Sequence, residues 1–224
     1  MSIFTNYDTK WFNVLTTEQQ SRVLQTIVIH AVPAGTMIEQ KGDLATNWMG
    51  VLEGLVKVSV GNADGRITSL TGIPAGGWFG EGSLIKKEVR RYDVFALRDS
   101  KIAKLPLTTF NWLLDNSIPF NRFLLEQLNA RVSQFIGRTE SDRLLNADDR
   151  VAACLAELFN QDLYPNTSLR LAITQEEIGY LAKLSRQRTN IALKNLEQKH
   201  IIRVEYGALH VLDLDRLKNS YKHD

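Results

Sequence analysis

Hydrophobic and polar residues alternate with a period of two through residues 36–105, in short runs separated by Gly, Asn and Asp. Such alternation is typical of half-buried strands, and residues 56–60 and 67–70 predict two strands joined by a tight loop. Several short strands separated by turns favour a small barrel or jelly roll. Residues 11–29, which precede this region, predict a helix.

The pattern becomes helical after Pro106, and residues 120–143 contain no proline. Within this stretch, side chains recur at spacings of three and four residues, and we call them the stripe: Leu125, Leu128, Val132, Phe135 and Thr139. A helix with such a stripe buries it against another surface. Two partners remain open, the chain's own barrel and a second copy of the chain, and both can apply on different faces. The length of the stripe favours a homodimer.

The last third of the chain predicts a winged helix-turn-helix. A hinge is expected near residues 145–149, followed by a helix. Thr174 and Glu177 have the spacing of a capping box, which predicts a short helix, and Ser185 can cap a second helix. Residues 202–211 predict a β-hairpin. Two short helices and a hairpin in this order are typical of DNA-binding domains.

Length and composition narrow the class of protein. The chain has 224 residues, of which 44% are hydrophobic and 23% charged, and this is sufficient for two folded domains. Its single cysteine, Cys154, cannot form an internal disulfide or hold an iron–sulfur cluster, which needs about four ligands. No apolar run reaches the roughly 18 residues of a membrane span, and no leader pattern is present. We therefore expect a cytoplasmic protein without a membrane partner.

Positive charge is concentrated near the predicted second helix. The formal net charge is only +2, but residues 183–203 contain six Lys or Arg side chains against Glu197 alone. Such a cluster is expected where a polyanion binds, although a solvated helix face would give the same count. Arg186 and Arg188 would lie near the start of the helix, where side chains reach base edges in the major groove.

Two segments of this region resemble the cyclic-AMP receptor / fumarate-nitrate regulator (Crp/Fnr) family of transcription factors. Residues 173–179 read ITQEEIG and residues 185–190 read SRQRTN. Upstream, residues 78–81 read WFGE, and Arg91 follows ten residues after the glutamate. This spacing is similar to the family's phosphate-binding cassette. The resemblance covers roughly residues 12–215.

The resemblance implies an α+β fold in three parts. These are an N-terminal cyclic-nucleotide-binding-like β-roll (jelly roll) at residues 12–119, a dimerisation helix at 120–145 and a winged helix-turn-helix at 146–224. The implied function is transcription regulation by a homodimer that binds a palindromic operator in double-stranded DNA under control of a small-molecule effector. RNA polymerase would be a further partner if the protein activates transcription.

By the same resemblance, Glu81 would bind the ribose of a cyclic nucleotide and Arg91 its phosphate. Tyr92 replaces a small hydroxyl residue of cyclic-AMP binders, and Phe135 and Ile136 replace residues that give hydroxyl groups to the base. Each lost hydrogen bond is worth about 0.5–1.5 kcal/mol. The open alternatives are a cyclic nucleotide, another small anion with an apolar body, and a structural network without ligand. The implied effector-binding residues are Gly80, Glu81, Gly82, Arg91, Tyr92, Phe135 and Ile136.

The predicted reading helix departs from the family's common Arg-Glu-x-x-x-Arg pattern. Arg186 is retained, whereas Gln187 and Ile191 occupy the other two places. Arg suits guanine, Gln suits adenine and Ile suits the thymine methyl group, so the operator is expected to differ from the family's commonest one. The implied DNA-binding residues are Thr174, Gln175, Ser185, Arg186, Gln187, Arg188, Thr189, Asn190 and Lys194.

Two other classes of protein are alternatives to a regulator. The four histidines have no metal-ligand spacing, and the chain lacks a nucleophile elbow and a phosphate loop, so we expect neither an enzyme nor a metal site. The second rival is a cyclic-nucleotide-like ligand-binding or interaction module without DNA contact. A gel shift on genomic fragments separates this alternative from a regulator.

Overall fold

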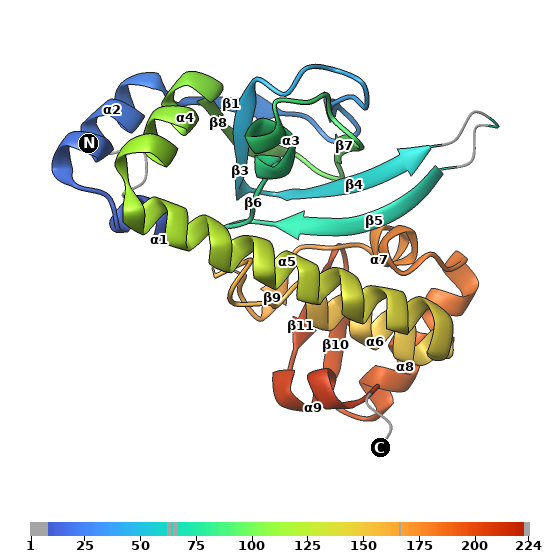
Figure 1. The fold of residues 1–224 in the computed structure, drawn as a ribbon. Coiled ribbons are helices and arrows are strands. Elements are labelled where there is room, and N and C mark those ends of the chain that lie inside the picture. Colours follow the sequence, from blue (N-terminus) through green and yellow to red (C-terminus); the bar gives the residue numbers. More distant parts are fainter. Residues whose placement is uncertain (1–8, 62–63, 65–66, 166, 222–224) are drawn as a thin grey trace.

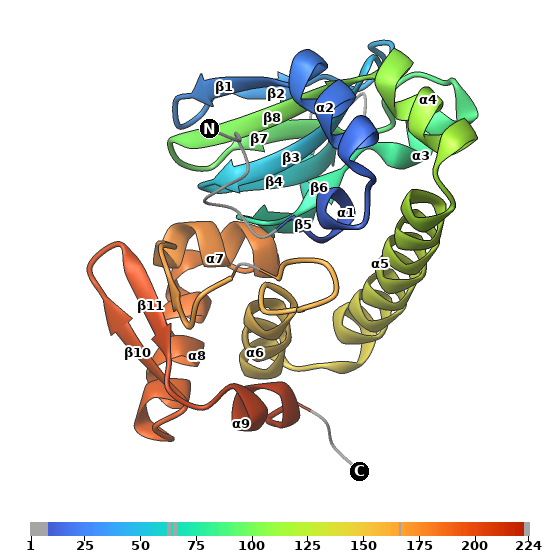
Figure 2. The same ribbon diagram turned by 90° about the vertical axis from the view of Figure 1, so that its left-hand side faces the viewer.

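The computed structural model describes residues 9–61, 64, 67–165 and 167–221, which form a β-roll, a long helix and a winged helix-turn-helix domain (Figure 1). This is the fold class predicted from the sequence. The winged domain lies below the β-roll, and the long helix runs along the side of both (Figures 1 and 2).

The β-roll consists of two four-stranded antiparallel sheets, with strand orders β1-β8-β3-β6 and β2-β7-β4-β5. In β4, Val56 and Val58 are buried and Lys57 is only partly buried, as the alternating pattern predicts. The alternation ends at a register shift against β5, beyond which Ser59 is buried and Val60 only partly buried. The strands are β1 (Val28–Val32), β2 (Met37–Glu39), β3 (Asn47–Glu53), β4 (Leu55–Gly61), β5 (Ile67–Pro74), β6 (Trp78–Phe79), β7 (Asp93–Ala96) and β8 (Ser100–Pro106).

The helix predicted over residues 11–29 is only partly right, because the structure has two short helices and a strand there. Thr16 and Gln19 form a capping box that starts a new helix. The following strand β1 pairs with β8 over five residues, so long-range pairing overrides the local helical pattern. The helices of this half are α1 (Lys10–Asn13), α2 (Thr17–Thr26), α3 (Glu81–Lys86) and α4 (Leu107–Asn116).

An aromatic cluster joins the terminal helices to the β-roll. The ring centroids of Trp48 and Trp78 are 4.5 Å apart, and Trp11 lies 4.9 Å from Trp78. Phe120, at the start of the long helix, packs edge-on against Trp48 at 5.6 Å and against Phe110 of α4 at 5.7 Å, and Phe110 lies tilted against Trp48 at 5.6 Å. The cluster therefore anchors the beginning of the long helix to the β-roll.

The long helix α5 (Ile118–Leu144) has 27 residues and presents two different faces. The residues buried against the chain's own domains are Phe120, Leu124, Gln127, Gln134 and Arg138. By contrast, Leu125, Val132 and Phe135 of the stripe are 67%, 57% and 44% exposed. The chain's own contacts thus use a face that is partly polar, and much of the apolar stripe remains uncovered within one chain.

The winged domain begins after a two-residue break. Asn146 caps its first helix, with its side-chain oxygen accepting hydrogen bonds from two backbone N–H groups at 3.0 Å. Thr174 and Ser185 cap the two helices predicted from the sequence. A third, two-residue strand was not predicted. The elements are α6 (Ala147–Glu157), β9 (Arg170–Leu171), α7 (Gln175–Ala182), α8 (Arg186–Gln198), β10 (Ile202–Glu205), β11 (Ala208–Val211) and α9 (Leu214–Asn219).

Candidate effector pocket and DNA-binding surface

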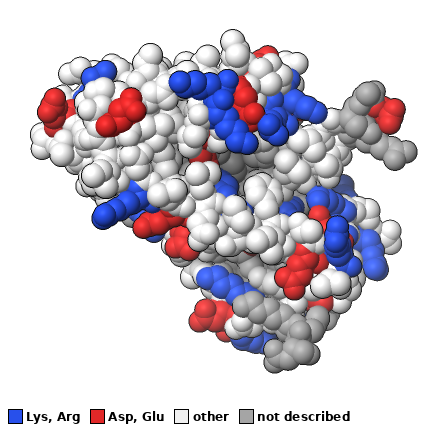
Figure 3. All heavy atoms as spheres, in the orientation of Figure 1, with Lys and Arg blue, Asp and Glu red and all other residues white. Residues whose placement is uncertain are grey.

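A cavity of about 360 Å³ lies between the β4–β5 sheet, helix α3 and helix α5. Figure 3 shows a hollow below the basic side chains that gather around α3. Its apolar wall includes Val58, Ile73 and Phe79 of the β-roll. Leu128, Val132 and Phe135 of the stripe close it from the side of α5, so three stripe residues border this cavity.

The structure brings most of the predicted effector residues together at this cavity. Those that line it are Gly80, Glu81, Gly82, Arg91, Tyr92 and Phe135. Ile136 does not line it, because its side chain is 64% exposed on the outer side of α5. Ile136 therefore points away from this cavity within one chain, since neighbouring residues of a helix point about 100° apart, and its contact with an effector stays a prediction.

The turn before α3 depends on glycine and on a buried arginine. Gly80 has a φ of 93°, and a Cβ at this position would lie 2.5 Å from Nη1 of Arg90. Arg90 donates hydrogen bonds to the carbonyls of Gly80 and Asn47, at 2.9 and 2.5 Å, and forms an ion pair with Glu39 at 2.8 Å. Its side chain is fully buried. Arg90 therefore holds the cassette in shape and lies outside the cavity lining.

Arg91 occupies the mouth of the cavity. Its side chain is 69% exposed and makes two 2.8 Å hydrogen bonds to the carboxylate of Glu88, which raise the pKa of Arg91 and lower that of Glu88. To bind an anion in the cavity, the guanidinium would exchange at least part of this exposed pairing.

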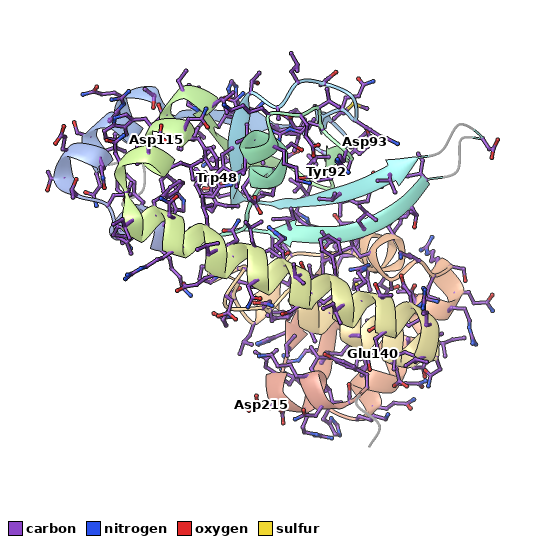
Figure 4. All side chains as sticks on the ribbon, in the orientation of Figure 1. Trp48, Tyr92, Asp93, Asp115, Glu140 and Asp215 are labelled. Atoms are coloured by element: carbon purple, nitrogen blue, oxygen red, sulfur yellow. The ribbon has the colours of Figure 1, made fainter. Side chains whose placement is uncertain are left out.

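A buried carboxylate, that of Glu81, and a largely buried guanidinium, that of Arg131, lie in the cavity wall. Glu81 is 4% exposed, and its Oε2 atom has no hydrogen-bond partner among the described residues. Its Oε1 atom is 4.0 Å from Nε of Arg131 of α5. Burial, followed by the charge of Glu81, raises the pKa of Tyr92 to about 12, so this phenol stays neutral between α3 and the β4 sheet (Figure 4). Among the described residues, the cavity wall thus presents a hydrogen-bond acceptor without a partner, Oε2 of Glu81, beside the positive charge of Arg131.

Arg131 is a functional candidate that the sequence reasoning missed. Burial by itself lowers its pKa, but the neighbouring Tyr164 and Glu81 raise the pKa above the usual value and keep the guanidinium charged. The available signal was its place on the long helix, three residues after Leu128 and four before Phe135. That spacing places Arg131 next to Leu128 and Phe135, two of the three stripe residues that line the cavity.

The second candidate site is the exposed side of α8. Arg186, Gln187, Arg188 and Lys194 are exposed, and Ser185 accepts a hydrogen bond from the backbone N–H of Arg188. Figure 3 shows Lys and Arg side chains over the α7–α8 side of the lower domain. This arrangement presents cations and exposed N–H groups at one helix end, as phosphate and base recognition require.

Three further predicted DNA contacts have less access to solvent. Thr189 is fully buried and donates to the Ser185 carbonyl at 3.0 Å, so it supports α8 from inside and cannot reach DNA in this arrangement. Asn190 and Gln175 are partly buried. Thr174 is exposed at the start of α7, where its hydroxyl accepts from the N–H of Glu177.

A pocketed β-roll joined by a long helix to a winged helix-turn-helix defines the class of effector-controlled DNA-binding regulators. Residues 29–117 match the cyclic nucleotide-binding domain family, and residues 149–220 match the Crp-like helix-turn-helix domain family. The chain belongs to the Crp/Fnr family of transcription regulators, whose members bind DNA under the control of an effector.

Individual relatives agree with this assignment. The transcriptional regulator SdrP of Thermus thermophilus is 30% identical over 75% of this chain and 80% of its own length. The cAMP-activated global transcriptional regulator CRP of Haemophilus influenzae is 27% identical over 80% and 84%. The solved structure of FixK2 from Bradyrhizobium japonicum superposes with a TM-score of 0.74 at 16% identity, covering 89% of this chain and 99% of that one, and supports the fold.

Among the described residues, no helix combines the length and apolar character needed to cross a membrane. Within the same ranges, no group of three or more His, Cys, Asp or Glu side chains is arranged to hold a metal ion.

Proposed function

We propose that this protein is a homodimeric transcription regulator that binds a palindromic operator through α8, under control of a small anionic effector in the β-roll cavity. The observation that carries the proposal is that one continuous helix, α5, borders the cavity beside Glu81 and also packs against the winged domain, which presents the exposed basic side of α8. Its proposed partners are double-stranded DNA, a second copy of the chain and, if it activates transcription, RNA polymerase. Because DNA is the proposed target, we expect the protein to act in the cytoplasm. The proposal includes no catalytic activity.

The exposed stripe supports dimerisation through α5. Leu125 and Val132 are more than half exposed, and they lie on one side of the helix with Phe135. A parallel contact between two such helices would bury these residues and relate the two winged domains by a two-fold axis. The half-sites of the operator would then lie about 34 Å apart.

Arg186 is expected to read a base. Arg186→Ala should weaken binding to the cognate operator by about 1–3 kcal/mol and relax the preference at one base pair, because a bidentate contact to guanine would be lost. Lys194→Ala, the matched control on the same helix, should weaken all sequences alike and flatten the salt dependence. Gel shifts on operators selected from random DNA provide the measurement. Equal losses on cognate and random DNA for Arg186→Ala would make it a phosphate contact.

The cavity supports an anion with an apolar or aromatic body as effector. Arg131 and Arg91 offer positive charge, Glu81 offers an acceptor to a hydroxyl or N–H group, and Tyr92 and Phe135 offer apolar surface. Cyclic AMP is the rival because the relative from Haemophilus influenzae is described as cAMP-activated.

We expect cyclic AMP to bind weakly. Phe135 and Ile136 stand in place of two hydroxyl partners of the base. Losing both hydrogen bonds would reduce the binding free energy by about 1–3 kcal/mol, which corresponds to roughly a 5- to 150-fold weaker affinity. Calorimetry with cyclic AMP and cyclic GMP measures this directly. Tyr92→Ser, which removes the bulky ring and places a small hydroxyl close to the backbone, should strengthen cyclic AMP binding. Micromolar binding by the unaltered protein that disappears in Arg91→Ala would contradict the expectation.

A further inference from the structure

The winged domain is bound tightly to the rest of the chain. Arg98 of the β-roll forms a 2.6 Å ion pair with Glu177 of α7, so the start of α7 lies against the β-roll. Gly72 of β5 faces Leu158 and Leu181, and a Cβ there would approach Leu181 to 2.8 Å. We call this packing of the winged domain on β5 and α5 the docked arrangement.

At the other end of α7, charged side chains of α5 and α6 hold its last turn. Arg138 forms a 2.7 Å ion pair with Glu157 and also donates to the Leu181 carbonyl. Arg150 donates to the Ala182 carbonyl at 2.9 Å. Cations bound to the carbonyls at a helix C-terminus are favourable, so the contacts of Arg138 from α5 stabilise the docked arrangement, whereas Arg150 joins α6 to α7 within the winged domain.

One contact of the docked arrangement reaches the cavity. Tyr164, in the loop after α6, is fully buried, and its hydroxyl donates to the Gly72 carbonyl at 3.3 Å. The same hydroxyl accepts hydrogen bonds from Nη1 of Arg131 at 3.1 Å and from Nε2 of Gln134 at 3.3 Å. Tyr164 itself does not line the cavity.

Arg131 therefore contacts three parts of the molecule through one rigid guanidinium. Nη1 bonds Tyr164 of the winged domain, Nη2 donates to the Trp78 carbonyl of the β-roll at 2.6 Å, and Nε faces Glu81 across 4.0 Å. Because the group is planar, a shift that optimises one of these contacts changes the others.

We propose that Arg131 and Tyr164 couple the cavity to the docking of the winged domain. An anion bound beside Glu81 draws the guanidinium of Arg131 into the cavity and weakens its bond to Tyr164. Effector binding and the docked arrangement then compete for one side chain, which gives the effector a different affinity for the docked and released forms, as allostery requires. The inference rests on the proposed effector site, but its test needs no effector.

The chain carries its own reporter of docking. Cys154, its single cysteine, is buried on α6 beside Arg138, and burial raises the pKa of its thiol to about 12. Its reaction with a disulfide reagent such as dithionitrobenzoate therefore requires the opening of the contact between α6 and α5. Under conditions where opening is reversible, the reaction rate is proportional to the open population.

The test is a double-mutant cycle on the full chain between Glu81 and Tyr164, which both face Arg131. Tyr164→Phe keeps the ring and removes the hydroxyl, so it should raise the Cys154 rate at least threefold. Tyr206→Phe, at a fully exposed tyrosine of the wing, should leave the rate unchanged. Rates are compared below the denaturant concentration at which the whole chain unfolds.

The decisive comparison uses Glu81→Gln. It should change the Cys154 rate at least twofold in the unaltered chain and by less than 1.3-fold in the Tyr164→Phe background, because the path through Arg131 is then interrupted. Glu88→Gln, at the cavity mouth beside Arg91, is the matched control. The coupling would be overturned if Glu81→Gln left the Cys154 rate unchanged in the otherwise unaltered chain, or if it changed that rate equally in both backgrounds. The proposed regulator function would survive that result and would fail only if operator binding were absent.

Discussion

Replacing both Leu125 and Val132 with Glu is expected to convert the proposed homodimer to a monomer and to weaken operator binding by at least about 100-fold. Both side chains are exposed within one chain, at 67% and 57%, and neither belongs to the chain's own core, although Val132 also borders the effector cavity. Across a dimer interface they would place four carboxylates in an apolar seam, which costs far more than the seam contributes. A monomer loses the second half-site, and bivalent binding is worth about 10²–10⁴ in affinity.

Light scattering gives the mass, and gel shifts on a palindrome and on a single half-site give the affinities. The monomer should bind the two DNA molecules almost equally. Asn129→Glu, at an exposed position on another side of α5, is the matched control and should remain dimeric. A double Glu variant that stays dimeric would exclude the stripe as the interface.

The parts of this structure that were predictable depend on neighbours in sequence. Thr174 and Ser185 were assigned as caps because capping joins residues that are three apart, and both bonds are present. The same holds for the alternation over residues 56–58 of β4 and for the stripe of α5. Local periodicity predicts which face of an element is apolar, and it does not by itself predict what covers that face.

Long-range contacts explain what was missed. Arg131 became part of the cavity because α5 crosses the β-roll at Glu81, fifty residues away in the sequence. Thr189 carries a hydroxyl typical of backbone contacts, yet packing of α7 on α8 buries it. The docked position of Tyr164 under β5 depends on three segments that meet only in the folded chain.

The adjacent residues Arg90 and Arg91 illustrate the same limit. The spacing from Glu81 pointed to Arg91 as the ligand-binding residue. The hydrophobic and polar pattern around the two arginines did not indicate which side chain is buried. In the structure Arg90 is fully buried on Glu39 and two carbonyls, whereas Arg91 is mostly exposed. Their roles should therefore separate in experiment, with one needed for the fold and the other for the cavity mouth.

Arg90→Met is expected to lower the free energy of unfolding of the β-roll by about 3–5 kcal/mol, because it leaves the carboxylate of Glu39 and the carbonyls of Gly80 and Asn47 without their buried partner. The same change at Arg91 should cost less than about 1 kcal/mol, since exposed ion pairs contribute little.

Urea unfolding followed by tryptophan fluorescence measures both variants, because all four tryptophans precede residue 113 and report on the N-terminal half. The two Arg→Met substitutions change volume and charge identically, so the difference between them isolates the environment of each side chain. An Arg90→Met protein that fails to fold while Arg91→Met folds normally would be the extreme form of the expected result. Similar midpoints for the two variants would show that Arg90 does not hold the turn at Gly80, and the left-handed conformation of that glycine would then have to be stabilised by α3 and the sheet alone.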